Sequence, residues 1–239
     1  MRRSAPQEPP ARLPAALAEL CAEVVACRRC PRLVAHRERV AHEKRRSFRD
    51  WEYWGQPLPG FGDPAARIVV IGLAPAAHGG NRTGRIFTGD RSGDWLFATL
   101  HRFGFASQST STHRDDGLYL TDAWVTAAAR CAPPDNQPTQ DEFTHCRPFL
   151  LREFQLLRQV RVVIALGRIA FDAFWAVRQA GGHPMPRPRP PFAHATVYPL
   201  GDLTLIGSYH PSQRNTQTGM LTQAMFDQVF ATARQLLQA

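Results

Sequence analysis

Four of the five cysteines have a spacing that suits a metal centre. Cys27 and Cys30 are close enough to bind one centre from a single turn, and Cys131 and Cys146 can close a long loop onto the same centre. Four thiolates suit zinc and a 4Fe–4S cluster, so the spacing leaves the metal open. The ordinary alternative is that such thiols lie unligated in the core as small apolar groups, which is how we interpret Cys21.

Three further segments carry residues that could do chemistry. Residues 72–93 are rich in glycine, which lets backbone N–H groups approach a ligand closely. Residues 131–138 form a proline-rich loop, and residues 207–219 place His210 and Ser212 after a strand. A glycine-rich turn and a single histidine are each more often structural than catalytic. Their shared position at the ends of expected strands favours a functional site.

The elements that position these loops alternate between two kinds. Continuous β-branched runs predict buried parallel strands, and segments with helical spacing of apolar residues separate them. The expected strands are residues 67–73, 118–126, 161–167 and two within 196–209. The expected helices are residues 15–46 with an interruption at Cys30 and Pro31, then 93–103, 140–159, 168–179 and 218–238. The alternation predicts an α/β fold of three layers, an α/β/α sandwich, which binds ligands at the carboxyl ends of its strands.

Length and composition suit one α/β domain, since the chain has 239 residues of which 44% are hydrophobic. We assign residues 1–14 to a mobile tail and residues 15–239 to the domain. No run is apolar enough to span a membrane, and the N-terminus does not resemble a secretory signal, so disulfides are not expected. The net charge of +9 favours a polyanionic partner such as nucleic acid, although a compositional bias would give the same balance.

Two of the loops carry long motifs that resemble a known family. Residues 72–90, GLAPAAHGGNRTGRIFTGD, and residues 208–219, SYHPSQRNTQTG, resemble the first and last signature motifs of the uracil-DNA glycosylase superfamily. The match is closest to family five, and it extends from about Cys27 to Phe230. The resemblance implies a central, mainly parallel four-stranded sheet between helices. It also implies a DNA-repair hydrolase that removes a deaminated base, above all uracil.

The resemblance also implies the cofactor. Family members with four cysteines at this spacing hold a 4Fe–4S cluster, which assigns Cys27, Cys30, Cys131 and Cys146 as its ligands. The cluster is expected to be mainly structural. It would tie the N-terminal helices and residues 131–146 to the core, near the face that binds DNA.

A glycosylase must flip the target nucleotide out of the duplex before it can reach the glycosidic bond. By resemblance, Phe87 offers the aromatic face on which the flipped base stacks, and ordinary core packing is the alternative role. Bond breaking leaves negative charge on the base, and His210 is placed to donate a hydrogen bond to the departing base oxygen. A neutral imidazole suffices, because one of its ring nitrogens carries a proton.

Two positions depart from the motifs of related glycosylases. Ala74 stands where the best-known members have a carboxylate that orients or activates water. The groups that could position the water instead are the backbone, Asn81, His78, Asp90 and Asn136. We favour Asn136, as a pocket amide that contacts base or water. Ala127 stands where related enzymes have an asparagine that reads uracil, so we expect a tolerant pocket that also accepts hypoxanthine or xanthine.

The residues expected around the flipped base are Ala74, His78, Phe87 and Ala127. Lys44 is the only lysine and lies far in sequence from the pocket motifs. A glycosylase that also cuts the strand needs an amine for a Schiff base with the sugar. We therefore expect a monofunctional enzyme that leaves an abasic site.

Polar and cationic residues near both motifs are candidates for contacts with DNA phosphates and grooves. They are Arg82, Arg85, Arg91, Ser212, Gln213, Arg214 and Asn215. The basic run at residues 44–46 is either a further phosphate patch or a solvated helix end. The expected partner is double-stranded DNA with a deaminated base, with single-stranded DNA as an alternative. We expect a monomer in the bacterial cytosol, at the nucleoid.

Two other classes of protein fit part of the pattern. An inactive nucleic-acid-binding module with a structural zinc would explain the charge, the cysteines and Ala74. It would not explain why Phe87, His210 and the glycine-rich loop fall together at strand ends. A redox protein that uses a cluster for electron transfer is the other class, and no G-x-G-x-x-G motif supports it.

Overall fold

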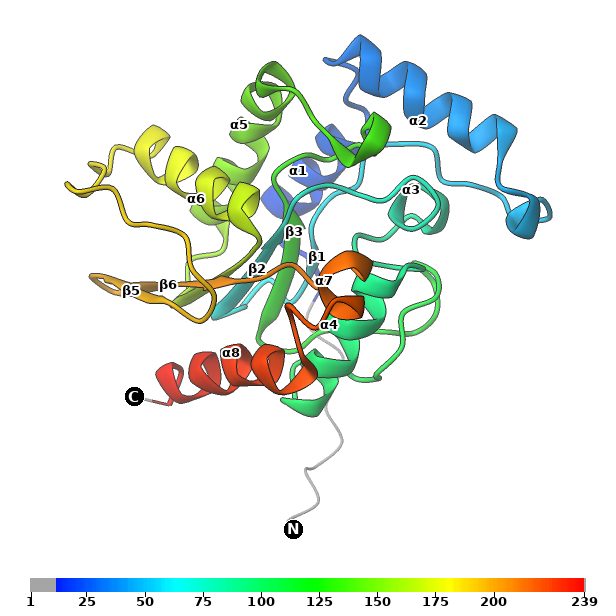
Figure 1. Ribbon diagram of the computed structural model, residues 1–239. Helices are drawn as coiled ribbons and strands as arrows, with labels where there is room; N and C mark the ends of the chain where they lie inside the picture. The colour runs from blue at the N-terminus through cyan, green and yellow to red at the C-terminus, as the bar shows by residue number, and fades with distance from the viewer. Residues whose placement is uncertain (1–11, 239) are drawn as a thin grey trace.

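The computed structural model describes residues 12–238, in which a sheet lies between two layers of helices (Figure 1). The predicted three-layer α/β/α sandwich is therefore confirmed. Most of the predicted mobile tail, residues 1–11, and Ala239 at the end of the predicted domain lie outside the described residues. Within the described range, no helix is both long and apolar enough to cross a membrane.

Six strands form the sheet, in the order β1-β3-β2-β4-β6-β5. They are β1 (Phe61–Gly62), β2 (Ile68–Gly72), β3 (Ala123–Ala127), β4 (Val162–Leu166), β5 (Val197–Leu200) and β6 (Leu203–Ser208). β3, β2, β4 and β6 are parallel, which matches the four-stranded expectation for the centre of the sheet. β1 and β5 add antiparallel edges. The residue patterns predict β5 as one of the two strands within residues 196–209, but not β1, which has only two residues.

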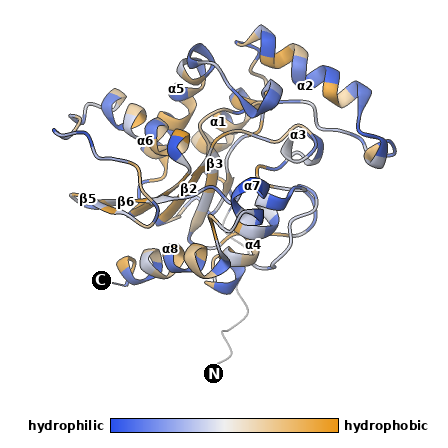
Figure 2. Ribbon diagram, in the orientation of Figure 1, coloured by the Kyte–Doolittle hydropathy of each residue, from blue (hydrophilic) through white to orange (hydrophobic). Residues whose placement is uncertain are grey.

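The central strands are buried on both faces because helices cover each face. β2, β3 and β4 bury every residue. Alternate side chains of β2 point to opposite layers: Ile68 and Val70 pack on one side, and Val69 and Ile71 on the other. Figure 2 shows the strands as the most continuously hydrophobic part of the fold, with hydrophilic faces on the helices around them.

The helices divide between the two layers according to their apolar faces. α4 (Arg91–Arg102) and α8 (Gln223–Leu236) cover one face of the sheet. α1 (Ala15–Val25), α5 (Gln140–Leu156) and α6 (Arg168–Ala180) cover the other. Both layers leave the carboxyl ends of the parallel strands free to carry the loops of the site.

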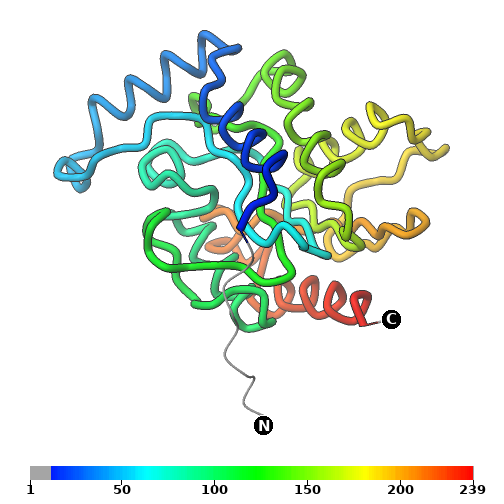
Figure 3. The backbone as a smooth tube through the Cα atoms, turned by 180° about the vertical axis from the view of Figure 1, so that it is seen from behind, coloured from blue at the N-terminus to red at the C-terminus, as the bar shows by residue number. Residues whose placement is uncertain are grey.

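The N-terminal helical segment is two helices, as the predicted interruption at Cys30 and Pro31 requires. α1 ends at Val25 and α2 (Pro31–Glu43) starts on a proline, which suits the first turn of a helix because its missing N–H needs no partner there. Seen from behind, α1 lies against the body of the molecule and α2 extends away from it (Figure 3). The turn between them carries the first two cysteines.

Two boundaries differ most from the predicted ones. β3 begins at Ala123 rather than at residue 118, because Asp122 has a left-handed φ of 60° and its carboxylate binds Arg67. α8 begins at Gln223, after Gly219 at φ 72° and Thr222, whose hydroxyl accepts from the N–H of Met225. The loops also contain two short helices, α3 (Gly80–Thr83) and α7 (Gln213–Gln217), and two 3₁₀ turns, η1 (Arg46–Phe48) and η2 (Pro134–Asn136).

Candidate active site

His210 lies just past the carboxyl end of β6. Gly167, just past β4, is its neighbour: a Cβ added there would lie 3.4 Å from the Cβ of His210. The side-chain amide of Asn215 donates to the carbonyl of His210 at 2.9 Å, which fixes the backbone of the loop. Burial lowers the pKa of His210 to about 4. The imidazole is therefore neutral at physiological pH and can donate through one nitrogen only.

Phe87 brings the glycine-rich loop to the same place. Its ring stacks on His210 with centroids 5.9 Å apart and an interplanar angle of 26°. The position of Phe87 depends on two close approaches: a Cβ on Gly72 would lie 2.4 Å from its ring, and a Cβ on Gly93 would lie 1.7 Å from its carbonyl oxygen. Phe87 itself has a left-handed φ of 54°. The loop thus holds an aromatic face against the histidine at some cost in backbone strain.

Ala74 and Ala127 share the same edge of the sheet. Ala127 ends β3, pairs with Gly72 at the end of β2, and is fully buried. Beyond the strands the two loops stay together, because the N–H of Ala129 donates to the carbonyl of Leu73 at 2.9 Å. The structure therefore places both departures from the related motifs beside the loop that carries Phe87.

Asp90 and His78 stand at opposite ends of the glycine-rich loop. Asp90 caps α4, since its side chain accepts from the N–H of Gly93 at 3.0 Å, and burial raises its pKa. A Cβ on Gly79 would lie 2.4 Å from the Asp90 carboxylate, so the acid faces the turn before α3. His78 shares a hydrogen bond of 3.1 Å with the hydroxyl of Tyr53, and burial lowers its pKa. Both groups belong to the loop but are engaged in holding its shape.

Asn81 is buried between the glycine-rich loop and α2. None of its surface is exposed, and its amide nitrogen donates to the carbonyl of Arg37 at 3.2 Å. Its side-chain oxygen has no hydrogen-bond partner among the described residues. The amide N–H₂ that could orient water is thus committed to fixing α3 against α2.

Asn136 occupies a different kind of position. It lies at the end of η2, is exposed, and has a left-handed φ of 56°, as does Asp135 before it at 53°. Asparagine and aspartate tolerate this region better than most residues. Its side chain makes no hydrogen bond to the residues that the structure describes, so the amide is free to meet a substrate or water. Its approach to a bound base stays a prediction.

Arg82 and Arg85 do not suit the role of phosphate contacts, because both side chains are buried. Arg82 is 4% exposed, donates to the carbonyls of His78 and Gly89, and lies over the rings of Phe48 and Trp51. Arg85 is 3% exposed and pairs with Asp116 at 2.8 Å. Their guanidinium groups hold the loops around α3 together. The sequence prediction was wrong here because an arginine beside glycines has the same pattern whether it faces solvent or protein.

The segment after His210 splits into structural and exposed residues. Ser212 caps α7 by accepting from the N–H of Asn215, and the Asn215 amide is used by the carbonyl of His210. Gln213 and Arg214 are exposed. Among these four candidates for DNA contacts, the last two have side chains free to reach a phosphate or a groove.

The four candidate metal ligands line one small cavity. Cys27, Cys30, Cys131 and Cys146 surround it together with His145 and Phe149. Contacts that reach the sulfurs include His145 Nδ1, 3.4 Å from Cys30 Sγ, and the Arg37 guanidinium, which donates to Cys131 Sγ at 3.1 Å. The backbone N–H of Arg130 also donates to Cys146. Burial raises the pKa of Cys30 to about 11 and that of Cys131 to about 12. In the described part of the chain, no three such side chains converge on a point that suits a single metal ion.

Comparison with known families decides what this arrangement belongs to. A family model described as the Uracil DNA glycosylase superfamily matches residues 59–234, a range that contains Phe87, His210 and all three loops. This chain belongs to the uracil-DNA glycosylase superfamily.

Relatives with curated names extend the likeness over nearly the whole chain. The "Type-5 uracil-DNA glycosylase" of Thermus thermophilus is 50% identical over 217 residues, which cover 89% of this chain and 94% of that protein. The protein of the same name from Mycobacterium tuberculosis is 49% identical over 222 residues, 92% of this chain and 81% of its own length. A third, from Pyrobaculum aerophilum, is 41% identical over 210 residues, 88% of each chain.

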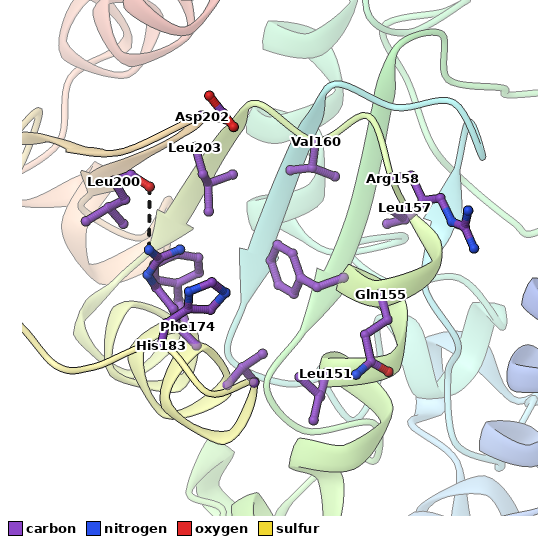
Figure 4. Close-up of a pocket in the computed structure, with 14 residues that line it drawn as sticks. Leu151, Gln155, Leu157, Arg158, Val160, Phe174, His183, Leu200, Asp202 and Leu203 are labelled. Carbon is purple, nitrogen blue, oxygen red and sulfur yellow. Dashed lines mark hydrogen bonds between the residues drawn. The ribbon is translucent and has the colours of Figure 1, made fainter.

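A separate groove of about 400 Å³ lies at the end of the sheet opposite to His210 (Figure 4). The last turns of α5 and α6 and the turn between β5 and β6 line it, with Phe174, Leu151 and Val160 among its apolar side chains. It stands before the start of β4, whereas His210 stands past the carboxyl ends of the strands. None of the predicted site residues lines this groove. This groove is therefore separate from the candidate active site.

Sequence reasoning missed two buried arginines near the cysteines. Arg37 lies on the buried face of α2 with Leu33 and Val34, so an arginine on an apolar helical stripe was the available signal. Arg130 precedes Cys131 and forms a buried ion pair with Glu153, and nothing in its local sequence marked it. Arg130 lines the cavity of the thiols, and Arg37 reaches its edge through the contact with Cys131 Sγ.

Proposed function

We propose that this chain is a DNA-repair glycosylase that excises uracil from DNA by hydrolysing the N-glycosidic bond. The observation that carries the proposal is the stacked pair of Phe87 and neutral His210 at the carboxyl edge of the sheet. Membership of the superfamily and relatives named uracil-DNA glycosylase support it.

His210 would act on the departing base. When the C1′–N bond breaks, its electron pair goes to the base, and the negative charge spreads to the base oxygens. The N–H of the neutral imidazole donates to one of these oxygens and stabilises the charge. Water supplies hydroxide to C1′ and a proton to the released base. Phe87 offers its ring to the flipped base, whose unstacking costs least when the base is mispaired.

Water must be oriented without a carboxylate at Ala74. We propose Asn136 for this role, or for contact with the base, because its side chain is exposed and uncommitted. Asp90 is the other candidate, on the loop that also carries Phe87. Asn81 is the weaker candidate, since its amide nitrogen already donates to Arg37.

We also propose that the pocket accepts hypoxanthine or xanthine. Ala127 presents a methyl group where an amide would read the edge of uracil, and a site without that amide leaves no polar group unpaired when another base enters. The substitution Ala127→Asn should narrow the enzyme to uracil. An oligonucleotide with hypoxanthine that stays intact while uracil is removed would contradict the proposal.

The enzyme would be monofunctional. Lys44, the only lysine, is the C-cap residue of α2, and its amine donates to the carbonyl of Arg49 at 3.2 Å. It belongs to a segment remote in sequence from the loops at the carboxyl edge. Strand cleavage without alkali or heat would contradict this.

We propose that Cys27, Cys30, Cys131 and Cys146 hold a 4Fe–4S cluster. Two observations support this fit: the thiols line one cavity, and a cation contacts one of the sulfurs. When bound, the cluster would supply a covalent tie between α1, α2 and α5. A brown protein with absorbance near 400 nm and about four irons per chain is expected, and a colourless zinc protein would contradict it.

The proposed partner is double-stranded DNA with a deaminated base, with single strands as the alternative form. Gln213 and Arg214 are the proposed groove or phosphate contacts, and residues 44–46 a further patch. We also propose that the protein acts as a monomer in the cytosol. Sedimentation of the protein with and without duplex DNA tests whether it is a monomer. Competition between duplex and single-stranded DNA for binding tests which form is preferred.

The decisive experiment measures uracil release from a labelled duplex with one G·U pair, followed by alkali. Wild type should create an alkali-labile site, and His210→Ala should lower the rate about 10²–10³-fold, as loss of an oxyanion donor does elsewhere. The matched control is His183→Ala, since His183 is an exposed histidine that lines the separate groove at the other end of the sheet. If wild type leaves uracil untouched, the missing carboxylate at Ala74 would favour an inactive DNA-binding module instead.

A further inference from the structure

Arg37 is a buried cation at the wall of the cysteine cavity. Its side chain is 1% exposed, although it belongs to α2, a helix that is mostly exposed. It points to the inside with Leu33 and Val34. A charged group in such a place costs several kcal/mol unless an opposite charge or a full set of hydrogen bonds offsets it.

The protein offers this guanidinium little negative charge. One nitrogen donates to Cys131 Sγ at 3.1 Å and to the carbonyl of Cys27 at 3.3 Å. The nearest carboxylate belongs to Glu38, at 3.8 Å, and it is half exposed and already paired with Arg28. The Nε atom of Arg37 has no hydrogen-bond partner within the described range, and the same holds for the Nε atom of Arg130.

The neighbouring Arg130 shows what a compensated arginine looks like in this fold. It is equally buried, and two of its nitrogens donate to both oxygens of Glu153 at 3.0 and 2.6 Å. No buried carboxylate of this kind faces Arg37 among the described residues. At 3.8 Å and half exposed, the Glu38 carboxylate compensates the charge of Arg37 less than Glu153 compensates that of Arg130.

We propose that Arg37 is the counter-ion of the four-cysteine centre and positions Cys131 within it. The inference rests on the proposal that these thiols hold a cluster, because four thiolates around a 4Fe–4S core carry net negative charge. The guanidinium then satisfies two needs with one contact: the cluster gains a buried positive neighbour, and the arginine gains its anion. Outer contacts of this type tune the potential and the stability of a metal centre.

The same residue connects the centre to the proposed active site. The carbonyl of Arg37 accepts from the amide of Asn81, in the glycine-rich loop. α2 runs beside α3 in the fold (Figure 1). A shift of α2 would therefore move α3, and Phe87 lies only a few residues after α3 in the chain. Arg37 is thus a positioning residue, whose side chain meets the sulfurs and whose main chain meets the loop.

The test compares four proteins prepared without oxygen: wild type, Arg37→Met, Arg37→Lys and Arg29→Met. Arg29 also lines the cavity, but it is exposed and lies over Phe149, so its charge is screened by water. The readouts are iron per chain, the midpoint potential of the cluster, and the rate at which the 400 nm absorbance bleaches in air.

Arg37→Met should have a more negative potential than wild type, since loss of a nearby positive charge disfavours the added electron. It should also bleach several-fold faster. Arg37→Lys keeps the charge but not the shared contact with sulfur and carbonyl, so it should shift in the same direction by less. Arg29→Met should stay close to wild type. If Arg37→Met fails to fold, Arg37→Lys against Arg29→Met carries the comparison.

An Arg37→Met protein with the potential and bleaching rate of wild type would overturn the inference, as would an equal shift in Arg29→Met. Failure of the cluster proposal is recognised separately, from wild type without iron. If wild type contains zinc, the rate of zinc release to a chelator replaces the midpoint potential as the readout. Faster release from Arg37→Met than from wild type supports the counter-ion role, and equal release rejects it.

Discussion

His210 owes its neutral state to burial and not to a charged partner. Desolvation is the only cause that lowers its pKa, to about 4. The consequence is a donor that needs no proton from solution. Because the folded pKa is below the value of about 6.5 in an unfolded chain, the unfolded state binds the extra proton first as pH falls.

We therefore expect the free energy of unfolding to fall as pH drops from about 6.5 toward about 4, because the unfolded state takes up the proton on His210 first. Above that window the neutral His210 causes no such loss. Urea unfolding of wild type at pH 7 and pH 5 measures the change. In His210→Asn this part of the pH dependence should be absent. A variant with the same pH dependence as wild type would mean that folding does not lower the pKa of His210.

Asn81 and Asn136 differ in hydrogen bonding: the side chain of Asn81 donates to α2, whereas that of Asn136 makes no hydrogen bond to the described residues. Asn81→Ala should lower stability by about 1–3 kcal/mol, because it removes a buried hydrogen bond between α3 and α2. Asn136→Ala should leave stability unchanged and lower the rate of uracil release. Thermal unfolding and single-turnover kinetics of both proteins separate the roles, and a rate loss confined to Asn81→Ala would reverse our assignment.

At the scale of the elements, Gly93 decides whether α4 can approach the loop of Phe87. A Cβ there would lie 1.7 Å from the carbonyl oxygen of Phe87, too close for any rotamer change to relieve. Gly93→Ala should therefore destabilise by about 1–3 kcal/mol and displace the ring. Gly181→Ala is the control, since its nearest atoms lie at 3.4 Å, and it should melt like wild type.

The ion pair of Arg130 and Glu153 joins the segment before Cys131 to α5. The pair is buried, and Thr126 of β3 also donates to Glu153 at 2.7 Å. Glu153→Ala should cost about 3–5 kcal/mol, because it leaves the guanidinium buried and unpaired. Denaturation by urea gives the value. Glu23→Ala breaks an exposed pair with Arg152 and should change stability little; equal losses in both proteins would contradict the argument.

At the scale of the whole molecule, the net charge of +9 is distributed between arginines that hold the fold and arginines that face solvent. Arg214→Gln should reduce the slope of log K against log salt by about one unit for duplex binding, because it removes one exposed phosphate contact. Arg82→Gln should leave the slope unchanged and lower the melting temperature, since that guanidinium is buried. Fluorescence anisotropy across a salt series measures both slopes. A lower slope in Arg82→Gln would restore it as a DNA contact.

The sequence by itself determined the layers, the parallel centre of the sheet and the three loops at its carboxyl edge. It could do so because β-branched runs and helical periodicity are local signals, and because the carboxyl ends of parallel strands always share one edge. Phe87 and His210 could be named from the sequence because each lies in a motif of consecutive residues. The break before Pro31 could also be predicted locally, because a single proline favours the first position of a helix.

Only the tertiary structure decided which polar groups are free. Arg82 and Arg85 have the sequence context of DNA contacts, yet they are buried, while Arg214 is exposed. The short edge strand β1, the hydrogen bond from Asn81 to Arg37, and the weak pairing of Arg37 with Glu38 also became visible only in the fold. The physical reason is that burial and pairing depend on residues far apart in the chain, and a local pattern gives the chemistry of a side chain but not its neighbours.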